Sequence, residues 1–210
     1  MSDPDPIVYV VEDDAITRRL IIALADSIGF ATRSFADADE FLDNFDIDQR
    51  GCLLLDVFMP GMSGLQLQTD LNRRGAIIPV IFVTGNTQVP DVVAAMREGA
   101  FNYMVKPFGN GELVTNIRLA IAIDRHNRQT LAQFDQIRAR ILSLTPRERE
   151  VLERLARGYA NKIMAHEMRL SERTVELHRA RVMEKMGAGS LAQLVRMVMD
   201  FEHRTRIPRH

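Results

Sequence analysis

Residues 52–64 read CLLLDVFMPGMSG, and this stretch decides the fold. Its first four residues, Cys52–Leu55, are apolar without alternation, which is typical of a short strand that is covered on both faces. The strand pattern stops at Asp56. Pro, Gly and Ser residues then form a turn, and the helical spacing of apolar residues begins at Leu65. A buried strand therefore leads through a turn into a helix.

This strand-then-helix unit occurs five times in the first part of the chain. Strand patterns lie at 7–11, 31–35, 52–55, 79–83 and 103–105, and helix patterns follow them at 15–28, 41–45, 65–74, 89–98 and 112–123. Repeated βα units predict a parallel sheet with helices on both faces. We expect a flavodoxin-like, doubly wound α/β domain over residues 7–122, with five strands in the order 2-1-3-4-5.

Carboxylates from two neighbouring strand ends should meet in this fold. With that strand order, the first and third strands are adjacent where the order reverses. Glu12 and Asp13 follow the first strand, and Asp56 follows the third. Two carboxylates about 5 Å apart would repel by roughly 3 kcal/mol at an effective dielectric constant near 20. A divalent cation removes that repulsion, and Mg²⁺ suits a few carboxylates together with a phosphoryl ligand.

Thr84 and Lys106 end the fourth and fifth strands at the same edge of the sheet. A hydroxyl, an ammonium group and a metal ion around one carboxylate would position and neutralise an anion with several oxygen atoms. We therefore interpret Asp56 as a nucleophile that accepts a phosphoryl group as an acyl phosphate. A single Asp or Lys at a strand end is usually only solvated, but five such residues at five matching positions favour a site.

The segments VVEDD, LLLDVFMPGMSG, PVIFVTG and YMVKPF, in this order and at this spacing, resemble the receiver domain of two-component response regulators. The resemblance implies that a sensor histidine kinase phosphorylates Asp56. It also implies that Mg²⁺ is held by Glu12, Asp13, Asp56 and the backbone carbonyl of Phe58. Three positions depart from the commonest receiver pattern and bear on the lifetime of the phosphorylated state. Glu12 stands in place of the commoner Asp, Phe58 lies beside the pocket, and Asn86 follows Gly85.

The same resemblance assigns the other strand ends. It implies that Thr84 and Lys106 contact the phosphoryl group, that a cis peptide bond joins Lys106 to Pro107, and that Tyr103 is a switch aromatic; the alternative for Tyr103 is an ordinary half-buried tyrosine. The receiver would assist only its own Mg²⁺-dependent phosphorylation and dephosphorylation, so we expect no enzyme. A phosphatase of the haloacid-dehalogenase type would need a second acid where Phe58 stands. A regulator locked in one state is the third hypothesis.

Composition frames the domain organisation. The chain has 210 residues, of which 46% are hydrophobic, and this suits one large packed domain or two small ones. The single cysteine excludes an intramolecular disulfide and a cysteine-rich zinc site. No apolar run approaches the roughly 20 residues of a membrane span, and the N-terminal MSDPDP lacks a signal-peptide pattern. We expect a cytoplasmic protein with no membrane partner.

The formal net charge of −1 conceals two opposite parts. Residues 1–125 carry 18 acidic and 10 basic residues, whereas residues 126–210 carry 10 acidic and 17 basic residues. A basic module suggests nucleic acid as its partner. The alternative is that the opposite charges only hold two domains together.

The second part is helical by pattern. Residues 123–141 contain no Gly or Pro, with apolar positions at 131, 134, 137 and 141, and we expect a helical linker that forms a short coiled coil or packs on one domain. Residues 142–206 predict four helices. Thr145-Pro146-Arg147-Glu148 is typical of a helix start, and Ser171 caps a third helix that ends at Met186. A short helix, a tight turn and a longer helix make a helix-turn-helix.

A helical wheel divides the third helix into two faces. Val175, Val182 and Met186 share the core face. The other residues expected to bind DNA lie on the opposite face or its shoulders: Arg173, Thr174, Glu176, Leu177, Ala180 and Arg181. Of these, Leu177 could contact a thymine methyl, Glu176 could accept from cytosine N4, and Arg181 could reach a guanine or a phosphate. The residues expected at DNA phosphates are Lys162, Arg179 and Lys185. The alternative for such a face in isolation is a solvated charged surface.

The segments LTPREREVL, NKIMAHEM, SERTVELHRARVMEKM and SLAQLVRM resemble a LuxR-type helix-turn-helix domain. With the receiver in front, the chain resembles the FixJ/NarL class of response regulators, in character closest to the FixJ type. The resemblance implies a transcriptional regulator that dimerises on phosphorylation, binds double-stranded promoter DNA and acts with RNA polymerase. In the last helix, Leu191, Leu194 and Val198 are either dimer contacts or core. In the receiver, the helix with Val92, Val93 and Met96 would pair receivers or release the DNA-binding module.

Overall fold

The computed structural model describes residues 5–85 and 89–206, so Asn86 lies outside the described residues. The chain divides into two compact units after Gln129. One helix, α5 (Asn110–Leu142), passes from the first unit into the second. Across the described ranges, no helix has the length and apolar character needed to cross a membrane.

The first unit is built on a five-stranded parallel sheet in the order β2-β1-β3-β4-β5, as the sequence predicts. The strands are β1 (Ile7–Val11), β2 (Ala31–Phe35), β3 (Gly51–Leu55), β4 (Val80–Thr84) and β5 (Asn102–Val105). Every residue of β3 and of β4 is buried. This explains why these strands read as continuous apolar runs rather than as alternating patterns.

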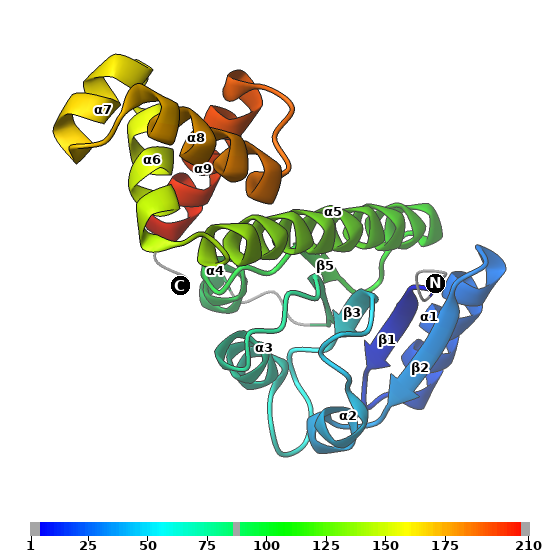
Figure 1. Cartoon of the computed structure of the whole chain (residues 1–210). Helices are drawn as coiled ribbons and strands as arrows, with labels where there is room; N and C mark the ends of the chain where they lie inside the picture. The colour runs from blue at the N-terminus through cyan, green and yellow to red at the C-terminus, as the bar shows by residue number, and fades with distance from the viewer. Residues whose placement is uncertain (1–4, 86–88, 207–210) are drawn as a thin grey trace. The chain divides into compact units, whose positions relative to one another are not determined.

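Helices cover both faces of the sheet (Figure 1). They are α1 (Ala15–Ser27), α2 (Ala38–Asn44), α3 (Gly64–Arg73), α4 (Val89–Arg97) and the first part of α5. Successive residues of β1 enter two different cores: Tyr9 and Val11 pack with α2, α3 and α4, whereas Val8 and Val10 pack with α1 and α5. The side-chain alternation of a strand thus holds both helical layers.

Gly64 fixes the approach of α3 to the end of β3. A Cβ atom on Gly64 would lie 2.1 Å from the backbone oxygen of Asp56, a distance that no side chain tolerates. Ser63 caps α3 by accepting a hydrogen bond from the backbone N–H of Gln66. The turn that follows Asp56 therefore requires glycine at its last position, and this glycine lets the backbone of Asp56 pack directly against the helix start.

A buried ion pair attaches α5 to the opposite end of β3. Asp124 is 1% exposed, and its Oδ2 accepts a hydrogen bond of 3.1 Å from the backbone N–H of Gly51. Its Oδ1 pairs with Nε of Arg128 at 2.8 Å. The guanidinium of Arg128 also donates to the backbone carbonyls of residues 47, 48 and 49. The receiver packing of α5 therefore continues to Arg128.

The second unit holds the helices α6 (Pro146–Ala156), α7 (Asn161–Met168), α8 (Glu172–Met186) and α9 (Leu191–Arg206). Thr145 and Glu148 form the predicted capping box of α6. On α8 the predicted core face is buried. Leu194 and Val198 are buried in the same core, so of the two alternatives for these residues, core packing and dimer contact, the structure favours core packing. Leu191 is partly exposed.

The second half of α5 packs on this unit. Ile137 and Ile141 lie against its hydrophobic core. The rings of Phe134 and Phe201 stack with centroids 5.2 Å apart and an interplanar angle of 15°. A pocket of about 300 Å³ lies beside this stack. This half of the linker therefore packs on a domain, as one of the two expectations has it, and a coiled coil with a second chain stays a prediction.

Candidate functional site

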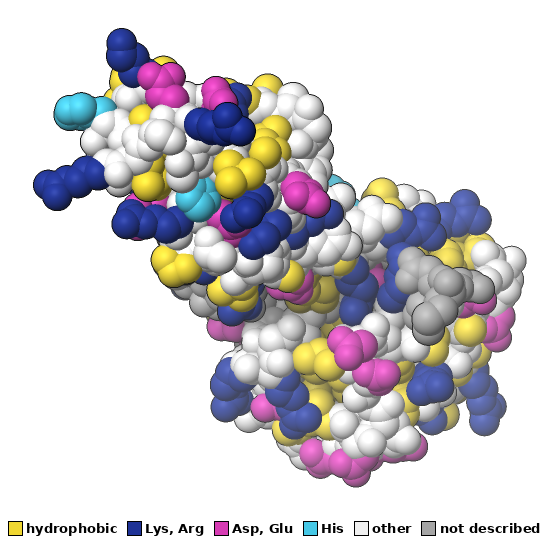
Figure 2. All heavy atoms as spheres, viewed as in Figure 1, with side chains coloured by type: hydrophobic (Ala, Val, Ile, Leu, Met, Phe, Trp, Pro, Cys, Tyr) yellow, Lys and Arg dark blue, Asp and Glu magenta, His cyan; other side chains and the backbone are white. Residues whose placement is uncertain are grey.

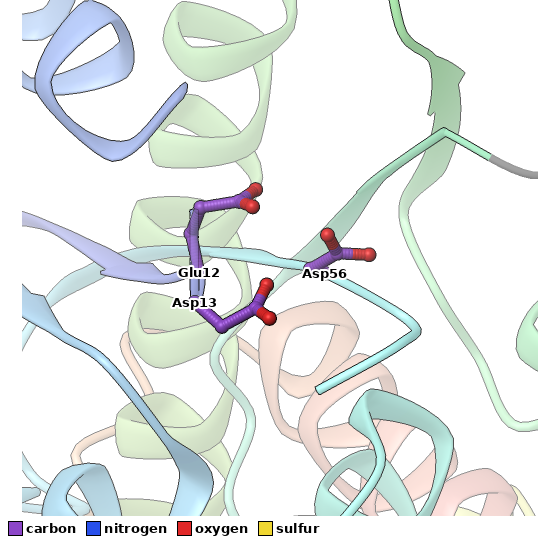
Figure 3. A group of neighbouring side chains, drawn as sticks. All are labelled: Glu12, Asp13 and Asp56. Atoms are coloured by element: carbon purple, nitrogen blue, oxygen red, sulfur yellow. The ribbon is translucent and has the colours of Figure 1, made fainter. Parts of the chain in front are cut away.

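Three carboxylates converge at the carboxyl ends of β1 and β3. Glu12, Asp13 and Asp56 each offer an oxygen atom, and these atoms all lie within 4.8 Å of one another. The parallel register pairs Val11 with Leu55, so the residues that follow these strands emerge side by side. Figure 3 shows the three side chains grouped at these ends. The sequence predicted this convergence from strand order alone.

Lys106 joins two of the carboxylates. Its Nζ lies 2.7 Å from Oδ2 of Asp56 and 2.7 and 2.8 Å from the two carboxylate oxygens of Glu12. Glu12 is 1% and Asp56 7% exposed. The backbone N–H of Lys106 donates to the carbonyl oxygen of Thr84 at 2.8 Å, and this bond holds the ends of β4 and β5 together. One ammonium group therefore serves two buried acids.

Burial and neighbouring charges shift the pKa values of this pocket in opposite directions. Burial raises the pKa of Glu12 to about 7, against the hydrogen bond from Lys106. Burial alone would lower the pKa of Lys106, but hydrogen bonds to Asp56 and Glu12 outweigh it and the pKa is raised. The pocket holds three carboxylates, and Lys106 pairs with two of them, so negative charge is in excess. Hard oxygen donors with excess negative charge fit Mg²⁺.

The other predicted site residues lie around this pocket. Thr84 is buried at the end of β4. Tyr103 is half-buried with its ring centroid 6.1 Å from that of Phe82, and burial raises the pKa of its hydroxyl. The backbone N–H of Phe58 donates to Oδ1 of Asp56 at 3.1 Å, while its side chain is 48% exposed. The peptide bond between Lys106 and Pro107 is cis, as predicted.

Arg18 is a residue of this site that the sequence did not reveal. Its Nη1 donates to the backbone carbonyls of Glu12 and Asp13. Asp14 caps α1 by accepting hydrogen bonds from both the backbone N–H and the hydroxyl of Thr17. Together these bonds hold the loop that carries two of the three carboxylates. The signal in the sequence is only one Arg in the first turn of a helix, which is too common to single out.

The predicted reading face of α8 is accessible. Leu177 is 51% exposed, and Thr174 at the shoulder is half-buried. The remaining predicted DNA-binding residues of this face are exposed: Arg173, Glu176, Ala180 and Arg181. Lys162, on α7, is exposed as well. Figure 2 shows Lys and Arg side chains gathered over the second unit, with a few hydrophobic side chains between them.

Two of the basic residues predicted to meet phosphates also have partners within the second unit. Arg179 is half-buried and donates to Oδ1 of Asn161 at 3.1 Å. Nζ of Lys185 lies 2.7 Å from Oε2 of the buried Glu148. This hydrogen bond, together with those from Thr145, lowers the pKa of Glu148 to about 2. Lys185 thus ties the end of α8 to the start of α6, and its contact with phosphate stays a prediction.

Comparisons with known proteins agree on both units. The family described as "Response regulator receiver domain" matches residues 8–118, and "Bacterial regulatory proteins, luxR family" matches residues 142–198. The transcriptional regulatory protein FixJ of Bradyrhizobium diazoefficiens is 41% identical, over 91% of this chain and 94% of the relative. The response regulator protein TodT of Pseudomonas putida is 38% identical, over 94% and 87%.

Solved structures give the same answer. The structure of the response regulator StyR has a TM-score of 0.84 at 38% identity and covers 93% of this chain and 99% of that one. Full-length FixJ from B. japonicum has a TM-score of 0.59 at 39% identity, over 94% and 98%. The acidic pocket at the sheet edge and the exposed basic helix thus occur together in a known combination of domains. This chain belongs to the transcriptional response regulators that join a receiver domain to a LuxR-type DNA-binding domain.

Proposed function

We propose that a sensor histidine kinase phosphorylates this regulator on Asp56, and that phosphorylation promotes homodimerisation and binding to promoter DNA. The observation that carries this proposal is the pocket itself, in which the carboxylates of Glu12, Asp13 and Asp56 converge and Lys106 bridges two of them. We place the protein in the cytoplasm because promoter DNA and RNA polymerase, its proposed partners, are there.

The chemistry is a phosphoryl transfer to a carboxylate. A carboxylate oxygen of Asp56 attacks the phosphorus of a phosphohistidine, a P–O bond forms, and the P–N bond to the imidazole breaks. Lys106 neutralises charge on the phosphoryl oxygens, and the hydroxyl of Thr84 donates a hydrogen bond to one of them. Mg²⁺, held by Glu12, Asp13, Asp56 and the carbonyl of Phe58, would neutralise further negative charge. The reaction modifies the protein and turns over no other substrate.

The phosphoryl group changes the partners of Lys106. It adds about −1.5 to −2 charges beside an ammonium group that now serves Glu12 and Asp56. We propose that Lys106 and Thr84 turn toward the new oxygens and that Tyr103 follows. Moving a 1:99 equilibrium to 99:1 requires roughly 5.5 kcal/mol of differential stabilisation, which charged hydrogen bonds and dimer formation together can supply.

The proposed dimer surface lies on α4 and β5, which pack against each other. Its apolar side chains are solvent-exposed: Val89, Val93, Met96 and Val105. Exposed apolar side chains gathered on one part of a domain are typical of a surface that binds another protein. A second copy of this surface is the partner that we propose for the phosphorylated state, and paired receivers would bring two reading helices to two half-sites.

The test compares wild type with Asp56→Asn, in the presence of Mg²⁺ and with or without a small acyl-phosphate donor. Intact mass reports the phosphoryl group, sedimentation reports dimerisation, and DNA binding is measured on a duplex enriched from a random pool. We expect all three to change for wild type and none to change for Asp56→Asn. Asp43→Asn, which alters an exposed acid on α2, is the charge-matched control and should behave as wild type. Equal mass, equal sedimentation and equal affinity in all conditions would refute the switch.

A further inference from the structure

The last turn of α8 depends on a residue from outside the helix. Helix ends leave backbone carbonyls without partners inside the helix. The N–H of Gly187 donates to the carbonyls of Met183 and Glu184, and these two are thereby capped. The carbonyl of Met186 instead accepts a hydrogen bond of 2.8 Å from Nη1 of Arg140, which lies on α5. The negative end of the helix dipole also favours a cation at this place.

Gly187 provides the space for this contact. Its φ is +61°, a conformation that glycine adopts without a steric penalty. A Cβ atom at this position would lie 2.9 Å from Nη1 and 3.2 Å from Cζ of Arg140. The guanidinium therefore packs directly against the glycine backbone, so the residue that ends α8 also forms part of the cradle for Arg140.

Arg140 is held on a fixed segment of α5. Ile137 and Ile141, its neighbours on the helix, pack against the core of the second unit. Met186, whose carbonyl it binds, is fully buried in that core. Lys185 makes a second tie from the end of α8, to Glu148. The carboxyl end of α8 is thus fixed by side-chain contacts, whereas the residues of its reading face are exposed.

We propose that Arg140 is a positioning residue for sequence-specific DNA binding. By holding the end of α8 to the linker helix, it sets the angle at which the reading face of α8 enters the major groove. Contacts to base edges need closer alignment than contacts to phosphates. Loss of Arg140 therefore reduces discrimination between sequences more than it reduces affinity for DNA in general. This inference rests on the proposed reading of DNA by α8.

The test measures the ratio of specific to non-specific affinity for the full-length phosphorylated chain. The specific probe is a duplex enriched from a random pool by wild type, and the non-specific probe is a shuffled duplex of the same composition. Arg140→Gln should lower the ratio about tenfold, the order of one lost base contact. Its affinity for the shuffled duplex and its salt dependence should stay as in wild type. Arg138→Gln, two residues away on an exposed part of α5, is the matched control.

Other results would overturn the proposal. An unchanged ratio would do so, as would an equal loss for Arg138→Gln. A parallel fall of both affinities, with the salt slope reduced by about 0.9, would make Arg140 a phosphate contact instead. If Arg140→Gln does not fold, Arg140→Lys replaces it in the test, because lysine keeps a donor and the charge. The ratio of specific to non-specific affinity must then fall, but by less than tenfold. Glu176→Ala separates the two hypotheses: if it also leaves the ratio unchanged, α8 does not read DNA at all.

Discussion

The carboxylate pocket of the receiver and the reading face of α8 hold their charges in opposite ways. In the pocket, charged groups from three strand ends are buried and bonded to one another, as in the pairs of Lys106 with Glu12 and Asp56. On α8, charged groups from one helix, such as Arg173 and Glu176, are exposed to solvent. The charges of Glu12, Asp56 and Lys106 are therefore coupled to the fold, whereas the charges of the reading face can change with little effect on the fold.

Substitution of Lys106 should give the largest effect, because it leaves two buried carboxylates without their shared cation. We expect Lys106→Met to lower the free energy of unfolding of the receiver by about 3 kcal/mol at pH 8 without Mg²⁺. The loss should be smaller at pH 6. The pKa of Glu12 is about 7 in the wild type and rises further without Lys106, so Glu12 is mostly protonated in both proteins at pH 6 and adds little to the difference between them.

Urea unfolding at the two pH values measures this effect, and added Mg²⁺ should restore part of the stability. Lys162→Met removes the same charge from an exposed position on α7, and it should alter the free energy of unfolding by no more than about 0.5 kcal/mol. Equal losses for the two variants would break the contrast between a coupled pocket and an independent surface.

The second prediction concerns Glu148, the buried carboxylate of the DNA-binding domain. We expect Glu148→Gln to lower the free energy of unfolding by about 2 kcal/mol at pH 6, because a charged hydrogen bond from Lys185 is lost. The folded-state pKa of Glu148 is lowered to about 2. Its contribution is therefore complete above the ordinary carboxyl pKa near 4.5 and is lost as the pH falls toward 2. The difference between variant and wild type should shrink accordingly.

The free energies of unfolding of wild type and of Glu148→Gln at pH 6 and pH 3 give that difference. Glu150→Gln is the matched control, since Glu150 lies on the same helix and pairs with Arg147 at an exposed site. Exposed pairs contribute little, so this control should lose less than about 1 kcal/mol. A loss for Glu148→Gln that does not depend on pH would show that packing, and not the ion pair, stabilises this corner.

The sequence predicted the features that repeat and missed those that reach across the fold. Five similar βα units predict a doubly wound parallel sheet, and with the expected order 2-1-3-4-5 the meeting of Glu12, Asp13 and Asp56 follows from the strand ends. The capping box at Thr145 is a local pattern with a fixed spacing. Bonds from Arg18, Arg128 or Arg140 to backbone carbonyls have no periodic signal, because any Arg at an exposed helical position looks the same in a sequence.

Lys185 shows the same limit from the other side. A basic residue in the last turn of an expected recognition helix suggests a phosphate contact. Its bond to Glu148 joins residues that are 37 positions apart, and Glu148 itself reads in the sequence only as half of a capping box. Helix packing brings the two together, and neither the wheel of α8 nor the start of α6 contains that information.

The third prediction tests whether the reading face separates sequence discrimination from general affinity. Glu176→Ala should relax the preference at one base pair by about 1.5 kcal/mol, because an acceptor for a base edge is lost. Lys162→Ala should weaken binding to all duplexes alike and reduce the salt slope by about 0.9. Affinities for a set of single-base variants of the selected duplex, measured at several salt concentrations, check both. Identical profiles for the two variants would mean that the groove face is wrongly assigned.

The smallest effect should come from the turn between α7 and α8, where the backbone and not charge decides. Arg169 has a φ of +55°, a left-handed conformation that is costly for residues with a Cβ atom. Arg169→Gly relieves that cost but adds freedom to the unfolded chain, so we expect a net gain of less than about 1 kcal/mol. Arg157 ends α6 with a φ of −85°, and Arg157→Gly relieves nothing and should destabilise by about 0.5 kcal/mol. The midpoint temperature of thermal unfolding should thus rise for Arg169→Gly and fall for Arg157→Gly. Shifts of the same sign would mean that lost side-chain contacts outweigh backbone conformation at this turn.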